Sequence, residues 1–385
     1  MRILHYQRDM RLKGGGVVRF VLDVAAAVAA RGHEVVLASP DVSDLPAEWK
    51  VGASGLPRAL KLPVPDLPMD LWGPGALREV RGAMAASGVV HIHGVWWPTN
   101  VQIARAADAL GVPYVITPHG MFDDVAVAQK SRKKKLFHAL VGRRLFERAA
   151  LVHVTAQGEL NQTHKWFHAP RTAIVPPVID LHLFRDLRGP EEARAAFTLP
   201  LASAPVVLFL SRVHPQKCPE VLIDAVALLK ERGVDCNLFI AGPGESGYIE
   251  TLNRRAAERG VADRTRFPGM VSGPLKVSLY QMATVFALPS PQESFGLVMT
   301  EAMSCGTPVV TTDSIDISPE LRASTAAETV PGTAEAFAGA LGGLLAEPDR
   351  RSRLAAAARA WLKDYLDPAA VAVQYEAMYA DICKR

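Results

Sequence analysis

Cysteines are few in this sequence, and their spacing excludes the sites that cysteines usually build. The four residues, Cys218, Cys236, Cys305 and Cys383, are scattered and form no C-x-x-C pair. We therefore expect neither a disulfide framework nor a zinc site with cysteine ligands. The pattern fits a reducing compartment.

Long apolar runs and acidic metal motifs are also absent from the sequence. No uninterrupted run approaches the ~18–20 apolar residues of a spanning helix, and the segment 1–16 has no apolar core of the secretory type. H-E-x-x-H and D-x-D spacings occur nowhere, so the sequence gives no basis for a metal site. These absences predict a cytoplasmic protein.

Three consecutive glycines occur near the start, but a dinucleotide-binding fingerprint does not. Gly14, Gly15 and Gly16 precede a helical stretch, where glycine permits close approach of backbone N–H groups to a phosphate or a substrate. They do not form G-x-G-x-x-G, and Glu34 begins the second strand-like run rather than ending it, as a nicotinamide cofactor would require. A flexible loop is the alternative for this segment.

The length and composition suit two globular domains. The chain has 385 residues, of which 49% are hydrophobic and 21% are charged, which is ample for two separate cores. Net charge is +4, but the segment 130–148 holds eight Lys or Arg against one Glu, a local +7, so the remainder carries 4 − 7 = −3. This asymmetry predicts an anionic partner or surface.

Short apolar runs alternate with helical stretches along the whole chain. The runs span residues 2–6, 34–38, 89–93, 113–118, 151–155 and 173–175, and then 205–210, 237–241, 265–267, 284–288, 308–312 and 328–330. Uniformly apolar strands between helices predict parallel sheets covered on both faces, the doubly wound α/β pattern. We predict two Rossmann-like domains facing across a cleft, residues 1–185 and 186–365, with a last helix at 366–385 packing back onto the first.

The segment 291–310 combines two acids with the start of a helix. Glu293 and Glu301 are separated by seven residues, and a Ser-Phe-Gly turn follows the first of them. If the helix begins near Phe295, its free backbone N–H groups form an anion site beyond the preceding strand. Two carboxylates beside such a site suit a ligand with a central phosphate and hydroxyls at both ends. Two solvated glutamates are the alternative.

Cations and glycines follow other strand-like runs of the second half. Arg212 and Lys217 lie in the loop that leaves the run 205–210, where two cations suit a diphosphate. Gly242 and Gly269 follow two further runs, so we expect their loops at the same edge of the sheet as the segment 291–301.

Histidines occur at predicted strand ends of the first half. They are His91, His93 and His119, and His119 follows the fourth run, where a doubly wound sheet places its ligand. Structural hydrogen bonding is the alternative role, and the three do not resemble a metal set.

The segment 130–148 predicts a helix with one apolar and one cationic face. Leu136 with Leu140, and Phe137 with Val141, follow i, i+4 spacing, which is typical of an interfacial helix. A solvated face over a core helix is the alternative, and no motif indicates nucleic acid. The candidate docking residues are Lys130, Arg132, Lys133, Lys134, Lys135, Arg143 and Arg144.

Taken together, the motifs resemble a known family. SRVHPQK, IAGPG, FPGMV and LPSPQESFGLVMTEAMSCGTPVV, in this order, are similar to the second domain of retaining glycosyltransferases of family 4, which have the GT-B fold. GGGVVRFVLDVAAAVAARGHEV, ITPHG and VPPVIDLHLF extend the resemblance through the first half, so it covers nearly the entire chain. The E-x7-E element is its most specific mark.

The resemblance implies roles for individual residues. Arg212 and Lys217 would hold the donor's diphosphate, Glu301 the ribose hydroxyls and Glu293 the transferred sugar, while His119 would lie near the sugar on the acceptor side. The implied catalytic residues are His119, Glu293, Arg212 and Lys217. The implied donor-binding residues are Gly15, Gly16, Arg212, Lys217, Gly242, Glu293, Ser294, Phe295, Gly296, Leu297 and Glu301. Fixed cations and a helix N-terminus would stabilise the leaving diphosphate without a metal or another cofactor.

The resemblance also implies partners. The donor would be a UDP- or GDP-sugar. The basic helix after TPHGMFDD is similar to that of members that build bacterial exopolysaccharide or lipopolysaccharide, whose acceptors are glycans on polyprenyl diphosphates. An anionic membrane surface is then a further partner, at the inner face of the cell membrane.

Two departures from the family pattern and three alternative functions remain. Ser294 stands where many members have glycine, and the segment 314–320 departs from the usual Gly-Gly pattern, which leaves the role of Glu320 open. The alternatives are a sugar-nucleotide epimerase of the same fold, a nicotinamide-dependent oxidoreductase, and a catalytically silent nucleotide-sugar-binding subunit.

Overall fold

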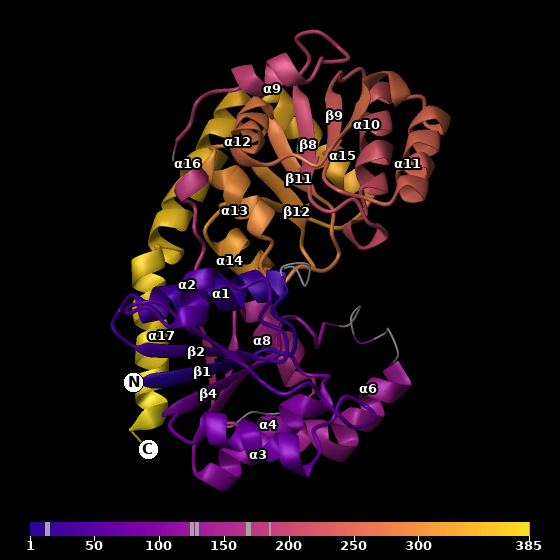
Figure 1. Cartoon of the computed structure of the whole chain (residues 1–385). Coiled ribbons are helices and arrows are strands. Elements are labelled where there is room, and N and C mark those ends of the chain that lie inside the picture. The colour runs from indigo at the N-terminus through magenta and orange to yellow at the C-terminus, as the bar shows by residue number, and fades with distance from the viewer. Residues whose placement is uncertain (12–15, 124–126, 128–130, 167–170, 185, 385) are drawn as a thin grey trace. The chain divides into compact units, whose positions relative to one another are not determined.

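The computed structural model describes residues 1–11, 16–123, 127, 131–166, 171–184 and 186–384 (Figure 1). Two of the candidate residues, Gly15 and Lys130, lie outside this set. The chain forms two compact units: unit 1 comprises Met1–Ile179 and Leu366–Arg385, and unit 2 comprises Asp180–Tyr365.

Unit 1 contains a seven-stranded parallel sheet with the order β3-β2-β1-β4-β5-β6-β7. Its strands are β1 (Arg2–Tyr6), β2 (Glu34–Ser39), β3 (Arg58–Lys61), β4 (Val89–His93), β5 (Tyr114–Thr117), β6 (Leu151–Val154) and β7 (Thr172–Ile174). Its helices before the C-terminal one are α1 (Gly16–Ala29), α2 (Ala47–Val51), α3 (Pro74–Met84), α4 (Pro98–Leu110), α6 (Ser131–Phe137), α7 (Arg143–Glu147) and α8 (Gln157–His164).

Both faces of this sheet are covered, which explains its uniformly apolar strands. One core cluster contains Leu4, Ile92 and Ile116 with residues of α3 and α4, and the other contains Ile3, Leu37 and residues of α1. Adjacent residues of each strand thus enter different cores, as the period of two requires.

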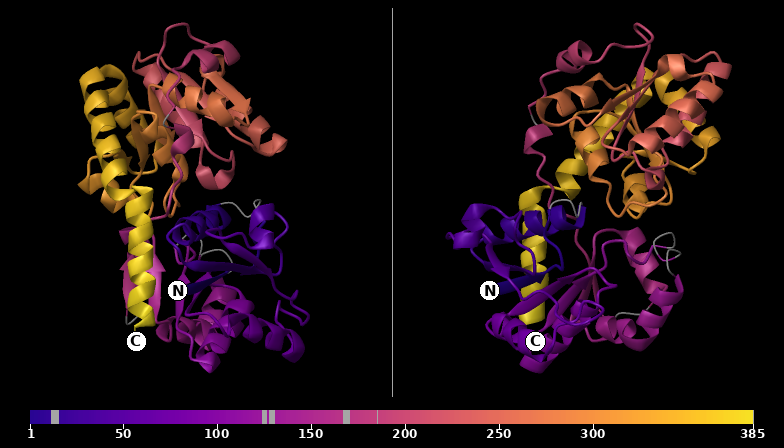
Figure 2. Two further views of the ribbon diagram at one scale, coloured as in Figure 1. Left: turned by 60° about the vertical axis from the view of Figure 1, so that its left-hand side comes forward. Right: turned by 45° about the vertical axis from the view of Figure 1, so that its right-hand side comes forward.

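The C-terminal helix α17 (Pro368–Cys383) packs in unit 1 beside α1, as both views of Figure 2 show. Its residues Val371, Tyr375 and Tyr379 belong to the same core as α1. Arg31, in the turn that follows α1, forms an ion pair with Glu376 of α17 at 2.5 Å. This packing brings two buried tyrosines against one face of the sheet.

Unit 2 contains a six-stranded parallel sheet with the order β10-β9-β8-β11-β12-β13. Its strands are β8 (Val206–Leu210), β9 (Asn237–Ala241), β10 (Thr265–Gly269), β11 (Val285–Leu288), β12 (Val309–Thr312) and β13 (Glu328–Val330). Its α-helices are α9 (Glu191–Ala196), α10 (Glu220–Glu231), α11 (Ser246–Glu258), α12 (Gly273–Met282), α13 (Leu297–Ser304), α14 (Ser318–Ala323), α15 (Ala334–Ala346) and α16 (Pro348–Tyr365). The 3₁₀ turns are η3 (His182–Phe184), η4 (Pro215–Lys217) and η5 (Ala262–Arg264).

The predicted doubly wound α/β class is confirmed in both units, with one strand more than the sequence indicated. The additional strand is β3, whose burial is only partial and whose sequence, RALK, lacks a continuous apolar run. In the segment 130–148, a π-helical turn (His138–Gly142) separates α6 from α7 where one helix was predicted. Among the described residues, no helix is long and apolar enough to cross a bilayer.

Candidate functional site

The carboxyl ends of β8 and β11 flank the point where the strand order of unit 2 reverses. From β8 the chain proceeds outward through β9 to β10, and β11 then pairs with the other side of β8. Open α/β sheets bind ligands in the crevice at such a switch point. The predicted residues Arg212 and Lys217 follow β8, and the turn 293–296 follows β11, so the fold brings both to this edge.

Lys217 and Glu293 form a direct ion pair across the switch point. Both side chains are largely buried, at 15% and 16% exposure. Arg212, in contrast, is exposed and has no ion-pair partner among the described residues. One cation of this edge is thus neutralised by a carboxylate, and the other is free to meet an anion.

Gly242 shapes the loop beside these cations. Its φ is +134°, and a Cβ built on it would lie 1.7 Å from the carbonyl oxygen of Ser211, so no other residue fits. Its N–H donates to the carbonyl of Gly269 at 2.7 Å. Gly242 therefore permits close packing of the β8 and β9 loops, while its own N–H is already engaged.

Helix α13 begins at Leu297, two residues later than predicted. Gly296 adopts a left-handed conformation at the N-cap with φ of 70°, and no side chain caps the helix. The N–H of Met299 donates to the carbonyl of Gly296 at 2.8 Å, which leaves the N–H groups of Leu297 and Val298 available to an anion. Phe295 is buried at 6% exposure, whereas Ser294 and Leu297 are partly exposed.

Glu301 contacts two residues of α12, one through a hydrogen bond and one through an ion pair. Tyr280 donates through its hydroxyl at 2.7 Å, and the Lys276 ammonium lies 2.5 Å from the same carboxylate oxygen, Oε2. Burial, followed by the Glu301 charge, raises the pKa of Tyr280 well above its usual value, so the phenol remains a donor. Glu301 is therefore held through one oxygen, which leaves Oε1 for a ligand.

Sequence reasoning missed Lys276 and Tyr280. The signal was their i, i+4 spacing on a short helix, which places both on one face. Nothing in the spacing of α12 and α13 along the chain shows that this face meets Glu301.

In unit 1, His119 and Gly120 form a left-handed turn directly after β5. Their φ values are 55° and 69°, and a non-glycine residue in this region is held there by its surroundings. The buried carboxylate of Glu159 accepts from the N–H of Gly120 at 2.7 Å and from the N–H and hydroxyl of Thr155 at 2.8 and 2.9 Å. Glu159, which sequence reasoning also missed, thus fixes the turn that presents His119.

Four further histidines lie beneath this turn. His5, His91, His93 and His153 come from the strands β1, β4 and β6 and are fully buried. His93 is the last residue of β4, as the sequence predicted, whereas His91 lies inside the strand. Burial is the main cause that lowers the pKa of each, to about 3 for His5 and about 4 for His153.

Nitrogens of His5, His91 and His93 lie within 4.8 Å of one another, a spacing that could hold a metal ion. However, most of their ring nitrogens already make hydrogen bonds. His91 contacts Tyr379 and Thr117 at 2.7 Å each, and His93 contacts His5 and His119 at 3.0 Å each. The donor set therefore fits a hydrogen-bonded network better than a metal centre.

Gly16, the first residue of α1, is exposed, and a Cβ on it would meet nothing within 4 Å. No packing against the described residues of unit 1 requires glycine here.

The basic residues of the segment 131–148 are mostly exposed. Arg132, Lys133, Lys135, Arg143 and Arg144 are exposed, while Lys134 is half-buried with its ammonium 5.4 Å from the ring centroid of Trp96. Leu136 and Leu140 are 60% and 66% exposed on the same helical segment. The exposed surface therefore mixes leucines with cations, which is typical of an interfacial surface.

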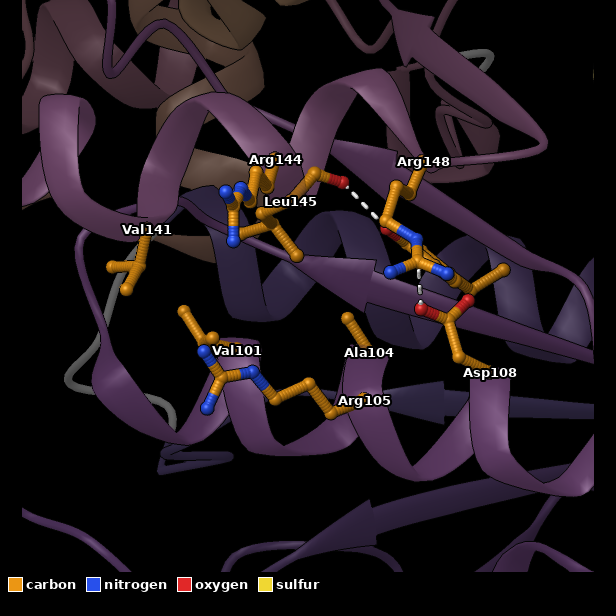
Figure 3. A pocket seen from close by; sticks show the side chains of 9 residues that line it. Val101, Ala104, Arg105, Asp108, Val141, Arg144, Leu145 and Arg148 are labelled. Atoms are coloured by element: carbon orange, nitrogen blue, oxygen red, sulfur yellow. Dashed lines mark hydrogen bonds and ion pairs between the residues drawn. The ribbon is translucent and has the colours of Figure 1, made fainter.

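A small cavity of about 90 Å³ lies between α4 and this segment (Figure 3). Its apolar lining includes Ala104 and Leu145, and Arg105, Arg144 and Arg148 surround it. Arg148 pairs with Asp108 at 3.3 Å, whereas Arg105 and Arg144 have no carboxylate partner among the described residues. The cavity therefore adds positive charge to the exposed basic surface.

Comparison with known families accounts for nearly the whole chain. A model of the glycosyl transferase 4-like domain matches residues 15–177, and a model of glycosyl transferases group 1 matches residues 193–361. The D-inositol 3-phosphate glycosyltransferase of Thermomonospora curvata is 31% identical over 371 residues, covering 89% of this chain and 85% of that protein. The enzyme of the same name from Mycolicibacterium smegmatis is 33% identical over 312 residues, covering 77% and 70%.

Solved structures share the fold. Alr3699/HepE of Anabaena in complex with UDP superimposes with a TM-score of 0.80 and 19% identity, covering 99% of this chain and 100% of that one. WaaG, a glycosyltransferase of lipopolysaccharide biosynthesis, superimposes with a TM-score of 0.69 and 19% identity, covering 98% and 99%. Two Rossmann-like units of this kind define the GT-B class of enzymes.

The chain belongs to the group 1 glycosyl transferases with a family 4-like first domain, as its motifs predicted. It is a glycosyltransferase.

Proposed function

We propose that the enzyme transfers a sugar from a nucleotide-diphosphate sugar, a UDP- or GDP-sugar, with retention of the anomeric configuration. The observation that carries this proposal is the convergence of Arg212, Lys217 and the uncapped N-terminus of α13 at the switch point of unit 2. These groups offer positive charge and N–H donors where a diphosphate would lie.

In the proposed reaction the bond between the anomeric carbon and the diphosphate oxygen breaks, and negative charge develops on the diphosphate. Arg212, Lys217 and the first-turn N–H groups of α13 stabilise this charge. The acceptor hydroxyl attacks on the same face of the sugar and gives its proton to the departing phosphate oxygen. No carboxylate then acts as nucleophile, and Glu293 contacts the transferred sugar.

The ion pair of Lys217 with Glu293 describes the site before the donor binds. The pair keeps Lys217 oriented without leaving a half-buried charge unpaired. We propose that the diphosphate takes over Lys217 and that Glu293 turns to the sugar hydroxyls. Glu301 accepts from the ribose hydroxyls through Oε1, because Lys276 and Tyr280 hold Oε2.

The other candidate residues complete the proposed donor site. Ser294, Phe295, Gly296 and Leu297 surround the sugar and phosphates, Gly242 shapes the adjacent loop, Gly15 and Gly16 approach the donor phosphate, and His119 contacts the sugar on the acceptor side. We propose that the reaction needs neither a metal nor another cofactor. Activity should therefore persist after extensive dialysis against EDTA.

The proposed donor class is tested by donor hydrolysis with UDP-, GDP- and ADP-sugars, together with a thermal-shift screen that includes NAD. We expect hydrolysis and stabilisation with one of the nucleotide sugars, and loss of both in Glu301→Ala. Stabilisation by NAD alone would overturn the proposal, and binding without any turnover would indicate a catalytically silent subunit.

For the acceptor, we propose a glycan or a polyprenyl-diphosphate-linked glycan in cell-surface polysaccharide synthesis. An inositol phosphate is the second candidate, because the relatives of about 30% identity are named for that acceptor. A panel of the donor with short lipid-linked glycans and with D-inositol 3-phosphate distinguishes the two. The proposed acceptor is wrong if transfer occurs only to the inositol phosphate.

We also propose that the basic surface of residues 131–148 docks the enzyme on an anionic membrane leaflet, at the inner face of the cell membrane. The exposed leucines among its cations support this role. Each well-placed cation contributes ~1 kcal/mol to such binding, so Lys133→Gln with Arg144→Gln should weaken vesicle binding by ~2 kcal/mol. Removing the same charge from unit 2, with Arg232→Gln and Arg353→Gln, is the control and should have little effect. If the two double variants lost vesicle binding equally, a specific docking surface would be refuted.

A further inference from the structure

The histidines of unit 1 form two separate hydrogen-bonded chains on one face of the sheet. The first runs from His5 Nδ1 to His93 Nε2 at 3.0 Å, and from His93 Nδ1 to His119 Nε2 at 3.0 Å. The second joins Tyr379, His91, Thr117 and His153. The first chain ends at His119 and the second does not include it.

The second chain has a fixed polarity. The carbonyl of Val175 can only accept, so His153 donates to it through Nε2 at 2.9 Å and accepts from the Thr117 hydroxyl through Nδ1 at 2.7 Å. Thr117 then accepts from His91 Nε2, and Tyr379 donates to His91 Nδ1, each at 2.7 Å. Both His91 and His153 therefore carry their proton on Nε2.

The first chain allows two polarities, but its three members must change together. If His119 donates through Nε2, His93 must accept through Nδ1 and donate through Nε2 to Nδ1 of His5. In the reverse polarity all three carry the proton on Nδ1. His5 Nε2, the inner end of the chain, is buried and has no partner among the described residues. No hydrogen bond joins the outer nitrogen, His119 Nδ1, to a described residue, and His119 is partly exposed, so this nitrogen remains for a ligand.

Surrounding groups keep this chain neutral and in place. The Phe20 ring lies edge-on to His119 with centroids 4.7 Å apart, and Glu159 holds the backbone of the turn. Burial is the main cause that lowers the pKa of His119 to about 3, so the ring acts as an uncharged hydrogen-bonding group.

We propose that His93 and His5 are positioning residues for His119: His93 binds its Nε2 and His5 in turn binds His93, and together they fix the ring orientation and tautomer of His119 and leave its Nδ1 for the sugar or the acceptor. This inference rests on the proposed function, since only that assigns His119 to the sugar side. A ring fixed before the substrate arrives loses no rotational freedom on binding, which favours the reactive geometry.

The direct test is a long-range ¹H–¹⁵N correlation spectrum of the histidine-labelled full chain, which identifies the protonated nitrogen of each ring. The proposal requires His5, His93 and His119 to share one tautomer, and His91 and His153 to carry the proton on Nε2. The proposal is overturned if His5, His93 and His119 carry their protons on different nitrogens. The proposal is also overturned if the purified protein contains stoichiometric zinc, or if added zinc shifts the signals of His5, His91 and His93 together. Either result would show that the cluster is a metal site.

Variants separate positioning from packing. His93→Leu should let the His119 tautomers average and lower kcat by about 10- to 100-fold, with the dissociation constant for UDP unchanged. His93→Asn, whose amide can still reach His119 Nε2, should restore a single His119 tautomer and part of kcat. His91→Leu is the matched control, because it removes an equally buried imidazole of the same strand from the other chain.

Equal averaging of His119 in His91→Leu and His93→Leu would refute the proposal, since packing alone would then explain the effect. Wild-type protein that has coupled tautomers but transfers no sugar would refute the proposed function and leave the hydrogen-bonded chain intact. The spectrum therefore tests the hydrogen-bonded chain, and the activity assay tests the proposed function, independently of each other.

Discussion

Acid should unfold unit 1 at a pH where most globular domains are stable. Four fully buried histidines, His5, His91, His93 and His153, and the partly exposed His119 lie on one face of its sheet, and burial lowers the pKa of every one below the ordinary value of 6.5. Because the folded pKa values are lowered, the unfolded chain binds more protons as the pH falls. Stability is therefore complete above pH ~6.5 and decreases below it.

The magnitude follows from the number of histidines. Each group that stays neutral in the folded state but titrates at pH ~6.5 when unfolded approaches a loss of ~1.4 kcal/mol per pH unit only below that pH, so it loses ~1.4 kcal/mol in total between pH 7.5 and 5.5. Five such groups give a loss of ~7 kcal/mol between pH 7.5 and 5.5, which is comparable to the whole stability of many domains, ~5–15 kcal/mol. Burial raises the pKa of Glu159, which acts in the opposite direction and offsets at most one of the five protons.

Urea unfolding followed by tryptophan fluorescence measures this effect. Five of the six tryptophans lie in unit 1, so the signal reports mainly on that unit. We expect the free energy of unfolding to fall steeply from pH 7.5 to 5.5, with an uptake of four to five protons. His5→Asn, which retains a polar group near Nδ1, should reduce the uptake by one proton. A flat profile over this range would refute the assignment of the five histidines as neutral in the folded state.

Three further variants test the donor site in unit 2. Gly242→Ala should destabilise unit 2 by about 2–4 kcal/mol in thermal unfolding, because its Cβ would overlap the Ser211 carbonyl. Gly260→Ala, which is also at positive φ (+68°) but has open space around it, should cost only about 1–2 kcal/mol, and equal losses would contradict the clash. Lys276→Met should weaken UDP binding in calorimetry about 3- to 10-fold by releasing Glu301 Oε2, and unchanged affinity would exclude this role.

Much of the fold and part of the site could be predicted from the sequence. Apolar runs predict strands because both faces of each sheet are buried. The strand β3 was missed because it is only partly buried and therefore lacks an apolar run. Arg212, Lys217 and Glu293 were predicted to share one edge, since they follow strands that are parallel and adjacent in the sheet. The contacts of Glu301 with Lys276 and Tyr280 could not be predicted, because α12 and α13 meet only through tertiary packing.

The hydrogen-bonded histidines of unit 1 also could not be predicted from local sequence patterns. His91 and His93 were expected at a strand end; His93 does end β4, whereas His91 lies inside the strand, and both are fully buried. Their hydrogen bonds depend on the register of β1, β4 and β5 and on the tyrosines of α17, which are distant in sequence. Local patterns carry no information about such contacts.

The central claim is that the switch point of unit 2 binds the diphosphate of a sugar donor, and calorimetric titration with UDP and GDP tests it most directly. Arg212 is exposed and unpaired among the described residues, so Arg212→Ala should leave the fold intact. We predict that one nucleotide binds the wild type, that Arg212→Ala loses about 10- to 100-fold in affinity, and that Arg232→Ala on the distant end of α10 loses none. Equal affinity of the wild type and Arg212→Ala would contradict the account.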